Sequence, residues 1–329
     1  MKKDKKSLRL ITEPIFDDIK LFEKEFRDAL SSEVRLINLV GKYIIRHKGK
    51  HIRPILTLLA SRVCGQPNLN SYKAAAMIEL LHIATLIHDD VVDEAEKRRG
   101  FLSINRIWKN KISILMGDFI FSKALIKMVG LKDFAALQLI ADTAEKLAAG
   151  EILQIEKSLT RSMTEEVYYQ MIYKKTASLI STSCELGAIT STGEKNDRKA
   201  MITYGTKLGM AFQIKDDLFD LLGNEKQTGK DIGADLKRNM VTLPLIYTYE
   251  QINRSKLRML KKIISSKKKT NSDIHDLNEI VHDAGGFNYA EEKINELNSQ
   301  AFEAITMYPE STYKQSMIDL INFNTQRSS

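Results

Sequence analysis

The feature that most constrains this chain is an acidic pattern, Asp-Asp-x-x-Asp, that occurs twice, at Asp89–Asp93 and at Asp216–Asp220. Each copy ends an apolar run with helical spacing. On a helix, the first and last aspartates of a copy lie one turn apart on the same face, where they repel each other. One such acidic pair is typical of a solvated helix end. Two copies instead predict two helices whose polar ends face one cavity and hold a cation.

Basic residues follow the first acidic copy, as Arg98-Arg99-Gly100. Carboxylate oxygens spaced by one helical turn suit Mg²⁺ bridged to phosphate. Guanidinium groups bind phosphate oxygens through two parallel hydrogen bonds. This one segment can therefore hold both a metal ion and the anion that the metal bridges to.

Apolar spacing predicts the fold class. Apolar residues recur every three or four positions, and the five prolines lie near segment starts or turns, where helices tolerate them. Strand-like alternation bounded by hairpin dipeptides is absent. We therefore predict an all-α fold, a single domain over residues 1–329 with roughly a dozen helices around a central cavity.

Two predicted helices carry the acidic copies, over about 71–95 and about 197–222. Residues 223–242 contain three glycines and several charges, which predicts a long functional loop. The other predicted helices include those over about 14–31, 33–47, 111–130, 133–158 and 164–191. A further helix is predicted from 49–54 to just before Gly65, another restarts at Pro244, and Gly285-Gly286 separates the last two or three.

Charge and hydropathy exclude several classes of protein. Much of the net charge of +8 comes from Lys2–Lys6 and Arg254–Lys269, which lack interleaved aromatic residues, so no nucleic-acid site is predicted. No apolar run approaches the roughly 20 residues that span a bilayer, and no signal peptide is recognisable. We expect a cytoplasmic protein. Transient contact with a membrane during product release is compatible with that location. Cys64 and Cys184 are predicted to be buried thiols.

These motifs resemble those of the all-trans polyprenyl diphosphate synthases. That family carries, in order, a Gly-Lys-x-x-Arg-Pro segment, a first Asp-Asp-x-x-Asp followed by Arg-Arg-Gly, a Lys-Thr-Ala segment and a second acidic motif that begins with Phe-Gln. This chain has them in the same order, at 49–54, 89–100, 175–177 and 212–220. The resemblance therefore covers most of the chain.

The resemblance implies a homodimeric enzyme that condenses isopentenyl diphosphate with an allylic diphosphate such as farnesyl or geranylgeranyl diphosphate. The allylic C–O bond ionises, the isopentenyl double bond attacks the cation, and a proton is lost. About two or three Mg²⁺ ions would neutralise the departing diphosphate. By resemblance the metal ligands are Asp89, Asp93 and Asp216, supported by Asp90, Asp217 and Asp220. By the same resemblance, the residues that contact the allylic diphosphate are Arg98, Lys175, Thr176, Gln213 and Lys230. Those that contact isopentenyl diphosphate are Lys50, Arg53, His82 and Arg99.

Three of these assignments have plainer alternatives. A lone histidine on an apolar helix is typical of a core residue, although His82 lies seven residues before Asp89 and so on the same face of the helix. Lys175 and Lys230, taken singly, are typical of solvated lysines. His88, next to Asp89, is expected to lie outside the set of metal ligands.

The chain departs from the family pattern at two places. His51 stands where the family often has an arginine, and Asn239-Met240 stand where many members have Gly-Lys. The second departure removes a lysine that would face a phosphate. Lys230 is retained.

Other functions were weighed against this one. A class I terpene synthase shares the aspartate-rich helix but cyclises the cation, and the isopentenyl residues Lys50, Arg53 and Arg99 argue against it. A non-catalytic prenyltransferase subunit is opposed by the two intact acidic motifs. A di-iron bundle would need Glu-x-x-His pairs beside the aspartates, which the sequence lacks. A short-chain synthase and a helical scaffold remain as alternatives.

Chain length is predicted from the helix that leads to Asp89. Thr85 and Leu81 lie four and eight residues before it on its side of the helix, whereas Ala84 lies about 140° away. Large aromatic residues four or five positions upstream stop growth early in the family. Small residues here predict a long all-trans product, about C30 to C50, along a stripe about 16 Å long, for quinone or related isoprenoid biosynthesis. Phe119 and Phe121 are candidates for the limit, and close helix packing is the alternative reason for small residues.

Overall fold

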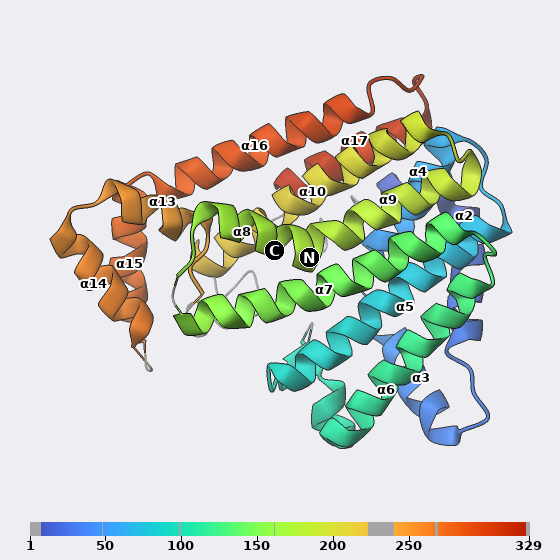
Figure 1. Ribbon diagram of the computed structural model, residues 1–329, viewed down its shortest axis with the longest axis horizontal. Coiled ribbons are helices and arrows are strands. Elements are labelled where there is room, and N and C mark those ends of the chain that lie inside the picture. Colours follow the sequence, from blue (N-terminus) through green and yellow to red (C-terminus); the bar gives the residue numbers. More distant parts are fainter. Residues whose placement is uncertain are drawn as a thin grey trace.

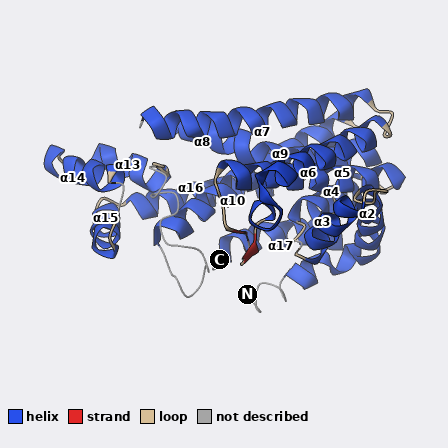
Figure 2. Cartoon of the chain, turned by 90° about the horizontal axis from the view of Figure 1, so that it is seen from below, coloured by secondary structure: helices blue, strands red, loops and turns tan. Residues whose placement is uncertain are grey.

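The computed structural model describes residues 8–47, 49–98, 100–160, 162–222, 240–266 and 269–326. Within these ranges the chain is helical almost throughout, and a two-stranded hairpin is the only sheet (Figure 2). The predicted all-α class is confirmed. No helix in these ranges is long and apolar enough to cross a membrane.

The first part of the chain, up to residue 129, surrounds one central helix, α5. The elements in order are η1 (Glu13–Ile15), α2 (Phe16–Ala29), α3 (Arg35–Arg46), α4 (Ile52–Cys64), α5 (Leu69–Val92), β1 (Lys97–Arg98), β2 (Phe101–Leu102) and α6 (Ile104–Val129). Helix α5 is apolar on nearly all sides, so it must be enclosed, and it packs against α2, α4, α6 and α9 (Figure 1).

The second part of the chain continues the bundle and adds an extension at one end, on the left in Figure 1, formed by α13 to α15. Its elements are α7 (Phe134–Thr160), α8 (Glu165–Ile172), the π-helical turn η2 (Tyr173–Ala177), α9 (Ser178–Ser191), α10 (Lys195–Leu222), α13 (Leu243–Gln251), α14 (Arg254–Ser265), α15 (Asn271–Asp283), α16 (Gly286–Ala304) and α17 (Thr312–Gln326).

Two apolar clusters form the core, and α10 contributes to both. Tyr204 and Leu208, in its first half, pack in the cluster around α4, α5 and α9. Ile214 and Leu218, in its second half, pack in the cluster with α8, α13 and α16. The second acidic motif therefore stands on a helix that is anchored in both clusters.

Three predicted segments differ in detail from the structure. The segment between the helices predicted over about 71–95 and 111–130 contains the hairpin. Helix α6 begins seven residues earlier than predicted, at Ile104, and is interrupted at Lys109, which has a φ of +70°. The helix predicted over about 164–191 begins as expected, with the Thr164 hydroxyl accepting a hydrogen bond from the amide of Val167, but is broken by η2. Helical periodicity does not reveal single-turn changes of this kind.

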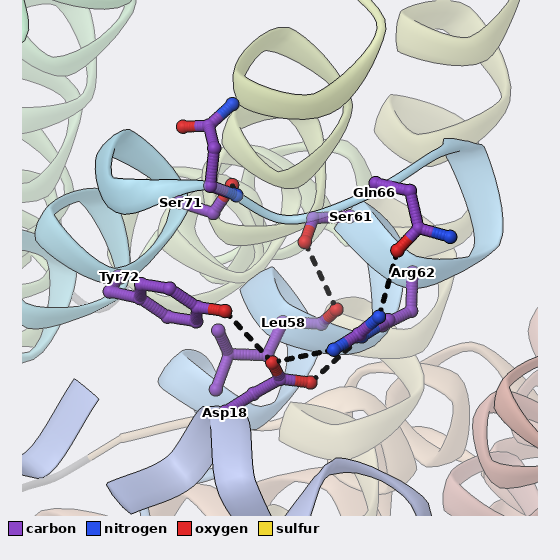
Figure 3. Close-up of polar contacts among 8 residues, drawn as sticks. Asp18, Leu58, Ser61, Arg62, Gln66, Ser71 and Tyr72 are labelled. Atoms are coloured by element: carbon purple, nitrogen blue, oxygen red, sulfur yellow. Dashed lines mark hydrogen bonds and ion pairs between the residues drawn. The ribbon is translucent and has the colours of Figure 1, made fainter. Parts of the chain in front are cut away.

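A buried ionic cluster fixes the start of α5 (Figure 3). Asp18 of α2 is 2% exposed and accepts two hydrogen bonds from Arg62 of α4, both at 2.9 Å. The hydroxyl of Tyr72, on α5, donates a third at 3.0 Å. Three helices are thereby joined at the end of α5 opposite the acidic motif.

Candidate active site

The first acidic motif lies at the last turn of α5, as predicted. Asp89 and Asp93 are half-buried, and the amide of Asp93 donates to the carbonyl oxygen of Asp89 at 2.8 Å. Asp90, between them, is only 4% exposed, and the Nε of Arg98 donates to its Oδ1 at 2.7 Å. Arg98 is therefore placed at the motif, but its partner there is a carboxylate.

Arg98 reaches this position because the chain turns sharply after it. Arg98 pairs with Phe101 across the hairpin. Gly100 has a φ of +82°, a conformation that favours glycine in two-residue hairpin loops. The glycine of the Arg-Arg-Gly sequence thus suits the turn that follows Arg98, and Arg98 lies beside the acidic motif.

The second acidic motif is held by a chain of neutral hydrogen bonds. Asp217 is 4% exposed, and its two carboxylate oxygens accept from the Tyr168 hydroxyl at 2.6 Å and from the Gln213 amide at 2.8 Å. The amide oxygen of Gln213 accepts in turn from the Thr176 hydroxyl at 2.8 Å. The predicted residues Thr176, Gln213 and Asp217 are therefore brought together, while Asp216 and Asp220 are half-buried beside them.

Lys175 stands in the π-helical turn and contacts α7. Its Nζ lies 2.7 Å from the carboxylate of Glu151 and 2.8 Å from the amide oxygen of Gln154. A Cβ on Gly150 would lie 2.7 Å from the backbone nitrogen of Lys175, so glycine is required for this approach. Sequence analysis missed these α7 residues and Tyr168. The available signal was a glycine inside a helix, followed at once by a glutamate and one turn later by a glutamine.

Four segments converge electrostatically on Asp89. Burial is the main reason that the pKa of its carboxyl is raised to about 6, and the nearby Glu151 carboxylate raises it further. Lys175 and Arg98 act in the opposite direction. Crowded carboxylate oxygens of this kind are the ligands that Mg²⁺ prefers, so the donor chemistry fits a divalent cation. In the described ranges, no three His, Cys, Asp or Glu side chains form a complete metal centre.

A second polar group lies about two helical turns before Asp89 on α5. Arg53 and His82 are hydrogen-bonded, with Nη1 and Nε2 3.0 Å apart. His82 is 8% exposed and lines a largely apolar cavity of about 90 Å³ together with Gly49, Asp90 and Arg98. The structure therefore brings parts of the predicted isopentenyl site to one cavity beside the first motif.

Other predicted residues lie apart from this cavity or outside the described residues. The Nζ of Lys50 is 5.1 Å from the ring centre of Phe323 on α17. Arg99 and Lys230 are not among the described residues. Leu81 and Ala84 are each 1% exposed, and the half-buried Thr85 donates from its hydroxyl to the carbonyl oxygen of His82 at 2.8 Å. Their role in chain length stays a prediction.

The two departures from the family pattern now have structural positions. His51 adopts a left-handed conformation, with a φ of 52°, and its ring lies edge-on to Phe22 and Phe26 of α2. Met240 is 4% exposed and packs in the apolar cluster around α13 and α16. Both side chains therefore contribute to the core.

The arrangement matches that of proteins with known roles. A model of the family described as Polyprenyl synthetase matches residues 34–281. The chain belongs to the polyprenyl synthetase family. Over 96% of its length this synthase is 33% identical to an all-trans-nonaprenyl-diphosphate synthase of Rhodobacter capsulatus, and the match covers 97% of that protein. Over 98% of its length it is 32% identical to the octaprenyl diphosphate synthase of Escherichia coli, and the match covers 99% of that protein.

The fold comparison agrees with the sequence comparison. The synthase superposes on the crystal structure of a polyprenyl synthase from Caulobacter crescentus, complexed with calcium and isoprenyl diphosphate, with a TM-score of 0.91, 29% identity and 98% coverage of both chains. The predicted family, reaction class and prenyltransferase activity are therefore confirmed. The names of the relatives also agree with a long product.

Proposed function

We propose that this synthase uses Mg²⁺ to condense isopentenyl diphosphate with an allylic diphosphate and makes an all-trans chain of about C30 to C50, a length that the small residues beside Asp89 allow. The observation that supports the site is the convergence on one carboxylate. Asp89 of α5, Glu151 of α7, Lys175 of η2 and Arg98 of the hairpin come from distant parts of the sequence and interact electrostatically.

The chain's own residues would act on the leaving diphosphate. Asp89 and Asp93, with Asp216 from the second motif, would hold Mg²⁺, which when bound neutralises charge on that diphosphate. Lys175 and Arg98 are each paired with a carboxylate, at 2.7 Å in both cases. A diphosphate is a stronger competitor for these cations than a single carboxylate, because it offers more charge and more acceptor oxygens. Both side chains would therefore turn from their present partners to the substrate.

Isopentenyl diphosphate would bind on the side of Arg53 and His82. Their hydrogen bond places an arginine and a histidine together next to the cavity that Arg98 also lines. Lys50 and Arg99 would complete the site. Asp90 and Asp217 would orient the motifs, because each carboxylate is buried and bonded to another side chain.

The direct test is incubation with farnesyl diphosphate, isopentenyl diphosphate and Mg²⁺, followed by chromatography of the dephosphorylated products. Thr85→Phe should shorten the product to about C15 or C20 and leave the first condensation largely intact. The added ring, four residues before Asp89, would block the path of the growing chain along α5. Leu69→Phe, at the exposed start of α5, is the control and should not shorten the chain. A long product from both variants would show that the chain does not follow Thr85.

We also propose that the enzyme is a homodimer whose subunits meet at α6 and α7. Large apolar side chains are exposed along these helices, with Ile126 and Val129 at 66% and Leu159 at 78%. Large exposed apolar side chains that gather on one face are typical of protein interfaces. Ile126→Asp combined with Val129→Asp should give a monomer in sedimentation, whereas Leu21→Asp, on the exposed side of α2, should not. A dimer in both cases would exclude this face.

A further inference from the structure

The hairpin of residues 97–102 carries the predicted diphosphate-binding arginines on a very small scaffold. Each strand has two residues, with Lys97 opposite Leu102 and Arg98 opposite Phe101. An isolated two-stranded hairpin is at best marginally stable in water. Contacts with the rest of the fold must therefore determine where its turn stands.

Helix α3 supplies such contacts through two ring side chains. The Tyr43 hydroxyl donates a hydrogen bond to the carbonyl oxygen of Leu102 at 2.7 Å. The ring centre of His47, one turn later, lies 4.2 Å from that of Phe101 and 4.2 Å from that of Tyr43. Trp108 of α6 meets Tyr43 edge-on at 5.3 Å. We call these four rings, Tyr43, His47, Phe101 and Trp108, the aromatic clasp.

The aromatic clasp lies beside the predicted substrate site, but its four residues are not among those assigned to bind substrate. Three of its rings line the same cavity as His82 and Arg98. The hairpin also contacts the first motif through the ion pair between Arg98 and Asp90, at 2.7 Å. A bound diphosphate would compete with Asp90 for the Arg98 guanidinium, so this ion pair is not a constant anchor of the hairpin. The clasp can persist in that state.

We propose that Tyr43 and His47 are positioning residues that set the location of Arg98 for diphosphate binding. This proposal rests on the proposed function, in which Arg98 contacts the allylic diphosphate. Neither clasp residue is assigned to a reacting atom. Their effect should therefore fall on substrate binding, through the hairpin, and much less on the rate of the saturated enzyme.

Tyr43→Phe removes only the hydroxyl that holds Leu102. We expect the KM for the allylic diphosphate to rise roughly three- to tenfold, the effect of one neutral hydrogen bond, with kcat changed less than about twofold. The control is Tyr204→Phe, whose hydroxyl donates to the carbonyl oxygen of Met317 at 2.8 Å in the core. That variant should lower the Tm and leave both KM values unchanged. Equal KM changes in the two variants, or none in Tyr43→Phe, would overturn the proposal.

Two substitutions of His47 test the ring contact separately. His47→Phe retains an aromatic ring against Phe101 and should keep KM near that of the wild type, whereas His47→Ala should raise it. If the two variants behave alike, ring packing is not what positions the hairpin.

Arg98→Ala, measured alongside, separates the two hypotheses. If it raises the KM for the allylic diphosphate, Tyr43→Phe added to it should have little further effect, because the clasp acts through Arg98. A raised KM in Arg98→Ala but not in Tyr43→Phe would refute the clasp alone. An unchanged KM in Arg98→Ala would refute the diphosphate assignment and the clasp proposal with it.

Discussion

The two acidic motifs share a sequence pattern but are held in different ways. Their second aspartates, Asp90 and Asp217, are equally buried, at 4% exposure. Asp217 is bonded by two neutral donors, Tyr168 and Gln213, that belong to core helices. Asp90 is bonded by the charged Arg98, which stands on the hairpin and whose side chain is 36% exposed.

This difference separates a fixed scaffold from an exchangeable contact. Neutral hydrogen bonds within the core keep the second motif in one geometry, because leaving them would expose buried polar groups to an apolar environment. The Arg98 guanidinium is partly exposed, so a diphosphate can compete with Asp90 for it. The first motif is therefore the one whose surroundings should change when substrate binds.

The largest expected effect is common to both motifs. Asp89→Ala and Asp216→Ala should each lower kcat by roughly a thousandfold or more, because each removes a predicted metal ligand that stabilises the leaving diphosphate. Steady-state kinetics with circular dichroism as a check of folding would measure this. Activity near that of the wild type in one variant only would mean that the motifs are not equivalent in catalysis.

Stability should distinguish the second aspartates. Asp217→Asn should lower the free energy of unfolding by about 1–3 kcal/mol. The amide nitrogen of asparagine cannot accept a hydrogen bond, so either the Tyr168 hydroxyl or the Gln213 amide would lose its acceptor. Asp90→Asn should cost less than Asp217→Asn, because Arg98 is partly solvated and keeps an amide oxygen as its partner. Denaturant unfolding of the metal-free proteins measures both. Equal losses would remove the distinction between the two motifs.

The pKa of Asp89 predicts a smaller effect of the opposite sign. Burial, followed by the Glu151 carboxylate, raises that pKa to about 6 in the folded protein, from an ordinary value near 3.8. The folded state therefore disfavours the ionised carboxylate, and the stability of the metal-free protein should fall as the pH rises from about 4 to about 6. Asp89→Asn should remove this fall and be more stable by about 1–2 kcal/mol at pH 7.

The control for that prediction is Glu151→Gln, which removes the neighbouring charge and should move the pH-dependent fall to lower pH. Unfolding free energies between pH 4 and pH 8 would measure both variants. An Asp89→Asn variant that is no more stable than the wild type at pH 7 would contradict the electrostatic account of the first motif.

The helices that carry the chemistry were predictable, and their partners were not. The predicted helix over about 71–95 corresponds to α5, and that over about 197–222 to α10, because long apolar periods identify helices well. The small hairpin was missed because each strand has only two residues, too short for an alternating pattern. The π-helical turn at Lys175 was missed because it preserves helical composition while shifting one turn.

The sequence by itself determined the helical class, the order of the motifs and the residue types able to bind a metal and diphosphates, because each of these is written locally in spacing and composition. Only the tertiary structure decided which groups meet. Hydrogen bonds join Arg62 to Asp18, Tyr43 to Leu102 and Tyr168 to Asp217, pairs that are 44, 59 and 49 residues apart in the sequence. Such pairs depend on the crossing of packed helices, and a local period fixes which face of a helix is apolar without fixing which residue lies opposite a given side chain.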